Sequence, residues 1–526
     1  MTHALSVTGT LLGKETQVGT TRPMFLGVYV ALVASLVLVA CGSGQPHQTA
    51  LGVNSATSEP AEGSALPNST TPNNQVAFLD LDLDGKISRF LEAPNSTLAA
   101  NIASEMGQTG DPRWTPWLID VLKLGFSSET TRTATRALAD LSGLSSTGNA
   151  ADDFVKYGSW VRDQQFDLGP EYREWKLAFL GALDPSYPTL VKDIESLELL
   201  SYIQWGGVRR GGIPELNNPE HVNANAAHFL QPDELVIGAV INTTPIAYPL
   251  RFINHHELLN DVVDDVPITL GYCSLCRTGI VYLTELPEDV LKFQTSGLLI
   301  DSNKIMVDNN TDSLWRHIHG DAIAGPKSGT TLTAVPSVTT TWSSWVEKHP
   351  TSLTISTPDT TWFPGQPERQ PITYDYTPGS AYQRYYSEEN LWFPAPTAPT
   401  TALGLKDEVV GIALEDLELA IPVEDLGSVP FVVNTSESTL LILPTGAGAR
   451  VYKSSEVPTP DLLDLDTIGT QWTETHVAVP LQHAPQQTVL FERVPSTQMF
   501  WFAWHALRPD TRIQEKTPTH ERNNSR

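Results

Sequence analysis

The chain has few cysteines and few basic residues, and each shortage excludes a class of protein. Three cysteines in 526 residues are too few for a small scaffold stabilised by many disulfides. The 33 lysine and arginine residues face 60 aspartate and glutamate residues, and the formal net charge is −27. Because an acidic surface repels phosphate groups, we predict that the protein binds no nucleic acid.

Several motifs are also missing from the sequence. There is no Gly-x-Ser-x-Gly nucleophile motif and no glycine-rich phosphate loop, so the sequence gives little support to a hydrolase. After residue 40, no apolar run approaches the length of a transmembrane helix. A hydrophobic content of 40% with 13 tryptophans is nevertheless ample for folded domains, and the chain length predicts two or three of them.

The one long apolar run covers residues 24–40 and ends at Cys41. Its length suits the core of a signal peptide. The end of the run, Leu38-Val39-Ala40-Cys41-Gly42, resembles the bacterial lipobox, which implies removal of residues 1–40 and acylation of Cys41. We therefore predict an extracytoplasmic lipoprotein, anchored to the plasma membrane or outer membrane by the lipid on Cys41. Two alternatives stay open: a single-span anchor in which Cys41 is incidental, and a true start at Met24.

A polar stretch and an acidic motif follow the lipobox. Residues 41–75 are rich in Ser, Thr, Pro, Gly and Asn, which predicts a disordered tether. Asp80, Asp82 and Asp84 alternate along the chain before a glycine, as at the start of a calcium-binding EF-hand loop. The twelfth position of that loop is Leu91 instead of glutamate. The alternative to a calcium site is therefore an acidic turn before a helix.

Residues 76–198 have the spacing of amphipathic helices. Ser96-Thr97 and Asp111-Pro112 are start signals, and apolar residues recur at helical intervals after them, as at Trp114, Trp117, Leu118, Val121 and Leu122. Helices of about 12 residues joined by short turns predict a small, repeat-like helical module. Its aromatic residues are expected in the core, and its surface is a candidate for binding a protein partner.

From residue 199 the pattern changes to short β-type runs separated by Gly and Pro. Residues 236–241 and 246–250 flank Asn242-Thr243-Thr244-Pro245, which predicts a hairpin. The predicted fold class is α+β, with the helical module followed by a larger β-rich domain over residues 199–513. Residues 514–526 are polar and are expected to form a flexible tail.

Three segments of the β-rich part stand out because they hold His, Cys or acidic residues at short spacing: 254–261, 271–279 and 311–320. Together with flanking motifs they resemble a bacterial family known as domain of unknown function 3179, over about residues 200–513. The matching motifs occur in order: Ile203-Gln204-Trp205-Gly206-Gly207, Gly212-Ile213-Pro214, Tyr248-Pro249-Leu250-Arg251, His256-Glu257 with Asn260-Asp261, Tyr272-Cys273, Ser313-Leu314-Trp315 and Phe500-Trp501-Phe502-Ala503-Trp504. The sequence departs from the family at Ser274, where proline is usual. Position 276 varies in the family, which counts against a role that requires both thiols.

His256, Glu257 and Cys273 lie within 18 positions, beside His255 and Cys276. Imidazole and thiolate suit copper or zinc, and a carboxylate can complete the coordination sphere. We therefore predict a Cu or Zn site that serves redox chemistry or metal handling. His317 and His319, if they lie on a strand, would point to one face and could join it.

Three other interpretations of these residues stay open. Cys273 and Cys276 can form a structural disulfide, as expected in an oxidising compartment. They can be a redox-active Cys-x-x-Cys pair, which requires a lowered thiol pKa. His256 and Glu257 can also be ordinary packing residues that hydrogen-bond a turn. The alternative function to a metal site is a non-catalytic surface module with a structural disulfide.

Overall fold

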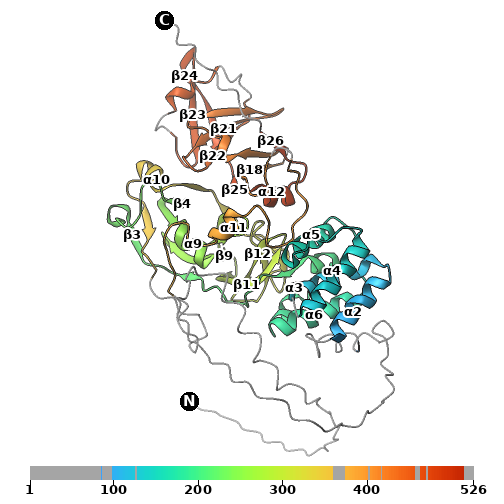
Figure 1. The fold of residues 1–526 in the computed structure, drawn as a ribbon. Coiled ribbons are helices and arrows are strands. Elements are labelled where there is room, and N and C mark those ends of the chain that lie inside the picture. The colour runs from blue at the N-terminus through green and yellow to red at the C-terminus, as the bar shows by residue number, and fades with distance from the viewer. Residues whose placement is uncertain are drawn as a thin grey trace, which may run out of the picture. The chain divides into compact units, whose positions relative to one another are not determined.

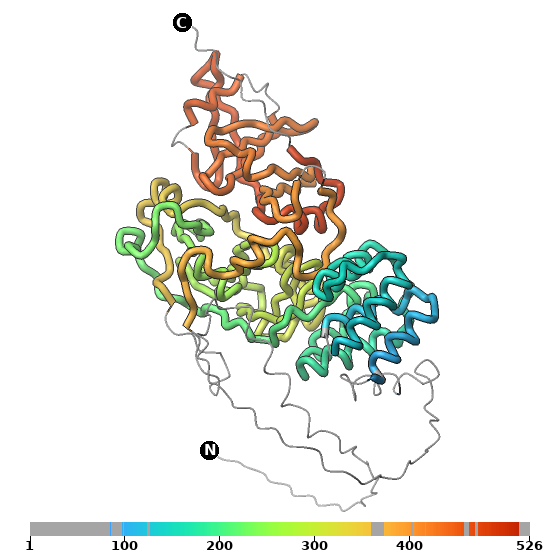
Figure 2. Tube along the Cα trace, viewed as in Figure 1, coloured from blue at the N-terminus to red at the C-terminus, as the bar shows by residue number. Residues whose placement is uncertain are grey.

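The computed structural model describes residues 85, 97–124, 127–358, 373–400, 403–415, 417–456, 462–468 and 472–514 (Figures 1 and 2). The predicted signal peptide, Cys41, the tether and the calcium ligands Asp80, Asp82 and Asp84 lie outside the described residues, and these predictions stay predictions. Within the described part of the chain, no helix has both the length and the apolar composition needed to cross a membrane.

Seven α-helices cover the described residues up to 202, which confirms the predicted helical region. They are α2 (Thr97–Gln108), α3 (Thr115–Leu124), α4 (Ser128–Ser142), α5 (Ala150–Arg162), α6 (Glu171–Leu183), α7 (Tyr187–Val191) and α8 (Leu197–Tyr202). Asp111 caps a short 3₁₀ turn in front of α3. Helix α4 ends at Gly143, whose φ of 73° suits the left-handed position that closes a helix.

The cap at the start of α4 gives a stability prediction. The Ser127 hydroxyl accepts a hydrogen bond from the backbone N–H of Thr130 (3.1 Å). Ser127→Ala is expected to lower the free energy of unfolding by about 1 kcal/mol, because one N–H at the helix start loses its partner. Urea unfolding followed by tryptophan fluorescence checks this value. The exposed neighbour Ser128 makes no cap, so Ser128→Ala is the matched control, and an equal loss in both variants would contradict the prediction.

The β-rich body begins with three five-stranded sheets. The first has the order β1 (Gln204–Trp205), β11 (Phe293–Ile300), β12 (Asn303–Asp308), β13 (Leu314–Arg316), β14 (Asp321–Ala324). The second has the order β15 (Ala334–Val335), β8 (Thr278–Leu283), β7 (Val266–Cys273), β6 (Leu258–Val263), β2 (Leu216–Asn217). The third has the order β16 (Ser337–Thr341), β4 (Leu235–Ile241), β5 (Thr244–Pro249), β17 (Leu353–Ile355), β3 (His221–Asn223). The predicted hairpin is present as β4 and β5.

The remaining strands form two further sheets and a small ribbon. One sheet has the order β25 (Thr497–Phe500), β18 (Glu408–Leu414), β19 (Leu417–Pro422), β26 (Arg512–Ile513). The other has the order β20 (Phe431–Asn434), β21 (Thr439–Pro444), β22 (Ala449–Ser454), β24 (Ala484–Arg493), β23 (His476–Leu481). The ribbon pairs β9 (Glu285–Leu286) with β10 (Asp289–Val290). Four short helices complete the body: α9 (Leu250–His256), α10 (Trp342–Lys348), α11 (Gln383–Ser387) and α12 (Trp501–Leu507). The predicted α+β class is confirmed.

The first two sheets lie against each other, with β11 beside β6 and β12 beside β7. Their contact is close because Gly271 on β7 has no side chain: a Cβ there would lie 2.5 Å from Cδ2 of His317. Helices and sheets also share one buried apolar cluster, which includes Trp175 of α6, Leu298 of β11 and Phe502 of α12. The site described next lies where these two sheets meet.

Candidate functional site

Cys273 and Cys276 flank a tight turn between β7 and β8, here called the dithiol loop (residues 273–277). The Cys276 N–H donates to the Cys273 carbonyl oxygen (3.1 Å), and Arg277 closes the turn with a φ of 54°. Both cysteines are free thiols. The structural disulfide, one of the alternatives left open by the sequence, is therefore not present between them in the structure.

The second hairpin at the site, β11–β12, places its tip against the two sulfurs. Asp301 and Ser302 form that tip with φ values of 53° and 59°, as a two-residue hairpin turn requires. The Ser302 carbonyl oxygen lies 3.7 Å from Sγ of Cys273 and 3.3 Å from Sγ of Cys276. The Asn303 amide donates to Sγ of Cys276 (3.4 Å). One backbone carbonyl thus brings both sulfurs to the same point.

The two thiols have opposite pKa shifts. Burial and the charge of Glu257 raise the pKa of Cys273, but hydrogen bonds from the Cys276 thiol and from the backbone of Lys304 and Cys276 outweigh both and leave it below its usual range. Burial and the hydrogen bond to Cys273 both raise the pKa of Cys276. Of the two thiols, Cys273 therefore loses its proton more readily, and Cys276 keeps its proton.

A buried ion pair lies beside the dithiol loop. Nζ of Lys304 is 3.0 Å from Oε2 of Glu257 and 3.0 Å from the Glu257 carbonyl oxygen. The other carboxylate oxygen accepts hydrogen bonds from the hydroxyl groups of Tyr382 (2.7 Å) and Ser274 (3.3 Å). Glu257 ends helix α9 in the left-handed conformation, with a φ of 57°. Because this conformation costs free energy for a residue other than glycine, the four contacts of Glu257 are what hold it there.

The two histidines before Glu257 point away from the sulfurs. Nδ1 of His256 is 2.8 Å from the Pro214 carbonyl oxygen, and Nε2 is 2.6 Å from the Tyr376 hydroxyl. Burial lowers the pKa of His256 to about 4, so the ring is neutral and donates from Nδ1. Nε2 of His255 lies 2.9 Å from the Asp375 carbonyl oxygen. Both imidazole rings thus form hydrogen bonds to the segment around residue 375.

That segment continues over the dithiol loop, and we call residues 373–388 the cover segment. The Tyr385 hydroxyl donates to the Leu275 carbonyl oxygen (2.9 Å), and the Tyr386 hydroxyl donates to the Ser274 carbonyl oxygen (3.1 Å). From another side, the Phe500 N–H donates to the Cys276 carbonyl oxygen (2.9 Å). Three consecutive carbonyls of the loop are therefore fixed from outside by aromatic residues of two distant segments.

The expectation that His317 and His319 share a strand face is wrong. Strand β13 ends at Arg316, and residues 317–320 form a turn. His317 is buried against Gly271, where burial and the charge of Lys304 lower its pKa to about 3. His319 is exposed. The two rings therefore do not act together.

The predicted metal ligands are only partly brought together. Cys273 and Cys276 meet, and Glu257 lies near them but is paired with Lys304. His255 and His256 bind the cover segment instead. Among the residues that the structure describes, no three His, Cys, Asp or Glu side chains are grouped to hold a metal ion. A copper or zinc site with His256 stays a prediction, and it would require that ring to leave both of its partners.

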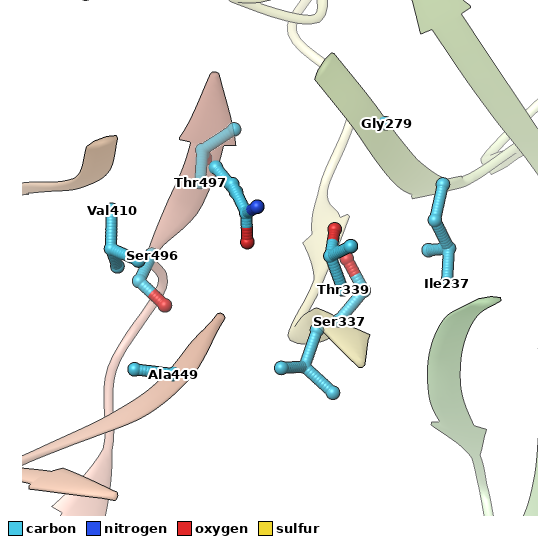
Figure 3. A pocket seen from close by; sticks show the side chains of 10 residues that line it. Ile237, Gly279, Ser337, Thr339, Val410, Ala449, Ser496 and Thr497 are labelled. Atoms are coloured by element: carbon cyan, nitrogen blue, oxygen red, sulfur yellow. The ribbon is translucent and has the colours of Figure 1, made fainter. Parts of the chain in front are cut away.

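A small pocket lies elsewhere in the β-rich body, between β16 and the strands β18 and β25 (Figure 3). Its lining includes Ser337, Thr339, Val410 and Thr497, and none of its lining residues is ionisable. The pocket therefore offers hydroxyl groups but no acid or base that titrates near neutral pH, and the candidate site is placed at the dithiol loop.

Fold and site together define an α+β protein whose β-rich body holds a buried, reduced Cys-x-x-Cys pair beside a buried ion pair. A family model described as "Protein of unknown function (DUF3179)" matches residues 210–511. This is more than half of the chain, so the chain belongs to that family, and the resemblance found in the sequence is confirmed. No curated protein and no solved structure matches the chain.

Sequence reasoning missed three parts of the site: Lys304, the Ser302 carbonyl and the tyrosines of the cover segment. Lys304 follows a turn in a predicted strand, where a lysine normally faces solvent, yet it is only 3% exposed. The Tyr-x-x-Tyr-Tyr spacing at 382–386 is a weak signal that becomes meaningful only once the fold places it over the loop.

Proposed function

We propose that this chain is a thiol–disulfide redox protein whose reactive group is the pair Cys273 and Cys276. The observation that supports the proposal most directly is that two free thiols, three residues apart, both lie against the Ser302 carbonyl oxygen. A lowered thiol pKa at the first cysteine and a raised one at the second are what a nucleophilic and a resolving thiol require.

The reaction is an exchange with a disulfide, RSSR. The Cys273 thiolate attacks one sulfur of RSSR, a mixed disulfide forms, and the first RS⁻ leaves and takes up a proton. Cys276 then gives up its proton and attacks Sγ of Cys273, so the second RS⁻ leaves with that proton. The protein loses two electrons as its disulfide forms, and RSSR gains them as two thiols.

A redox titration of the full chain tests the proposal. The protein is equilibrated in two buffer series, one of reduced and oxidised dithiothreitol for low potentials and one of reduced and oxidised glutathione for higher ones, because redox-active Cys-x-x-Cys pairs span about −270 to −120 mV. It is then unfolded in acid and alkylated, and the alkylated thiols are counted by mass spectrometry. We expect Cys273 and Cys276 to lose alkylation together in one two-electron transition. Cys276→Ser is expected to abolish the transition, while Cys41→Ser, which removes the third cysteine, is expected to leave it unchanged. If both thiols stay alkylated under the most oxidising buffers, the proposal is wrong.

Measuring the metal content of the same sample distinguishes the copper or zinc hypothesis from the proposed redox function. About one equivalent of metal that is lost in Cys273→Ala would favour a metal site, since soft thiolates select copper and zinc. A metal-free protein that oxidises reversibly would favour the dithiol. The titration and the metal measurement therefore give different results for the two functions.

We further propose that the site works outside the cytoplasm, on a chain anchored through a lipid on Cys41. Disulfide-bonded molecules persist in that oxidising environment, which suits the proposed exchange. Export and acylation are tested by metabolic labelling with a fatty-acid analogue, which Cys41→Ser should abolish. A protein partner for the helical module stays a prediction.

A further inference from the structure

Both sulfurs are enclosed from three directions. The tip of β11–β12 lies on one side, the Phe500 backbone meets the loop from a second, and the cover segment spans a third. As a result, Cys273 is 2% exposed and Cys276 is not exposed at all. An attacking thiolate must approach a disulfide sulfur closely, so access limits the rate of exchange as much as thiolate character does.

The cover segment is fastened at several points. The Tyr385 ring is fully buried, its hydroxyl bonds the loop at Leu275, and its backbone carbonyl accepts a hydrogen bond from Nζ of Lys406 (2.5 Å). The Tyr382 hydroxyl bonds Glu257, and the Ala381 carbonyl oxygen accepts from the Asn254 amide (3.4 Å). Moving the segment would break these bonds together, so the closed arrangement is the ground state.

From this enclosure we infer that the dithiol takes low-molecular-weight disulfides as substrates and that the cover segment, through Tyr385 and Tyr386, excludes the disulfides of folded proteins. This inference rests on the proposed redox function and names its substrate class. On this inference, a small disulfide needs only part of the cover segment to move before it reaches Cys273. A protein disulfide carries its own surface to the site and requires the whole segment to leave.

The test compares two oxidants on the reduced full chain. One is 2-hydroxyethyl disulfide, and the other is a folded protein with an exposed disulfide. The rate of loss of the Cys273 and Cys276 thiols is measured with each oxidant, in buffer and in concentrated urea. The rates in urea, where the loop is uncovered, correct for the different reactivities of the two oxidants.

After correction by the rates in urea, we expect the thiols in buffer to react about 100 times faster with the small disulfide than with the protein disulfide. This factor corresponds to a cover segment that is open in about 1% of the molecules, if only the protein disulfide requires the open state. Replacing both Tyr385 and Tyr386 by alanine should reduce that preference at least tenfold by speeding the reaction with the protein disulfide. Tyr157→Phe is the matched control, because the Tyr157 hydroxyl also bonds a backbone carbonyl, that of Leu144 (3.3 Å), but in the helical region.

The outcomes separate the two proposals. If neither oxidant converts the thiols in folded protein, the redox function itself fails. If both oxidants convert them with equal corrected rates, the redox function stands and the small-substrate inference is overturned. If the double alanine variant does not fold, Tyr386→Phe is measured in its place. This variant removes the hydrogen bond from the Tyr386 hydroxyl to the Ser274 carbonyl oxygen. It must raise the rate with the protein disulfide more than Tyr157→Phe does.

Discussion

Replacing Lys304 by methionine is expected to lower the free energy of unfolding by about 3–5 kcal/mol, because the Glu257 carboxylate then stays buried without its cation. The two side chains are almost completely covered, so water cannot take over the role of the ammonium group. Nζ of Lys304 also bonds the Glu257 carbonyl oxygen, and this acceptor loses its partner as well. Urea unfolding at neutral pH, followed by tryptophan fluorescence, measures the loss.

Two further variants show whether the loss comes from the unpaired charge. Adding Glu257→Gln to Lys304→Met removes the buried charge while an amide oxygen can still accept from Tyr382, so we expect most of the stability to return. Lys192 is exposed, and Lys192→Met is expected to change stability by less than about 0.5 kcal/mol. A double variant that is no more stable than Lys304→Met would mean that the lysine acts through packing and not through its charge.

The local parts of the fold could be predicted because their signals are local. Asp111 before a proline and the apolar spacing after it predict a helix start, and the structure has a capped turn and α3 there. The hairpin of β4 and β5 follows from two β-type runs around a polar turn, in which Asn242 takes a φ of 51°. The meeting of Cys273 and Cys276 is equally local, since three residues separate them within one turn.

The partners of His256 and Glu257 could not be predicted, because they come from distant segments. His256 and Tyr376 are 120 positions apart, and Tyr382 is 125 positions from Glu257. A histidine beside a glutamate has the same local appearance whether it faces a metal ion or a tyrosine hydroxyl. Only the fold, which carries the cover segment across α9, decides between the two.

The stability of the protein is expected to fall by about 4 kcal/mol between pH 7 and pH 5, because two buried histidines remain neutral in the folded state. Burial lowers the pKa of His256 to about 4, and burial together with Lys304 lowers that of His317 to about 3. In the unfolded chain both groups titrate near 6.5. Below that pH the unfolded state therefore binds more protons, and each histidine costs about 2 kcal/mol at pH 5.

Other histidines act in the same direction, and some other groups oppose it. Burial lowers the pKa of His319 to about 4 and also lowers the pKa values of His255 and His505, so these three residues add to the loss. Their rings are more exposed than those of His256 and His317, so solvent screening makes their contributions smaller. A hydrogen bond that His221 donates to the Asp261 carboxylate raises the pKa of His221, so this residue adds stability as the pH falls and makes the total loss smaller. The pKa of Glu474 is lowered to about 2, in spite of burial, by His349 and Arg450, so its stabilising contribution is lost only below about pH 4.5. The buried carboxyls whose pKa is raised by burial, such as Glu215, favour folding as they take up protons and so oppose the loss. The decrease between pH 7 and pH 5 is assigned mainly to His256 and His317, the two fully buried rings, with smaller additions from His255, His319 and His505.

Urea unfolding at pH 7, 6 and 5 measures this decrease, and His256→Gln is expected to remove about half of it. The exposed His228 is the matched control, and His228→Gln should leave the decrease unchanged. Stability that stays constant from pH 7 to pH 5 in the unmodified protein would contradict the prediction.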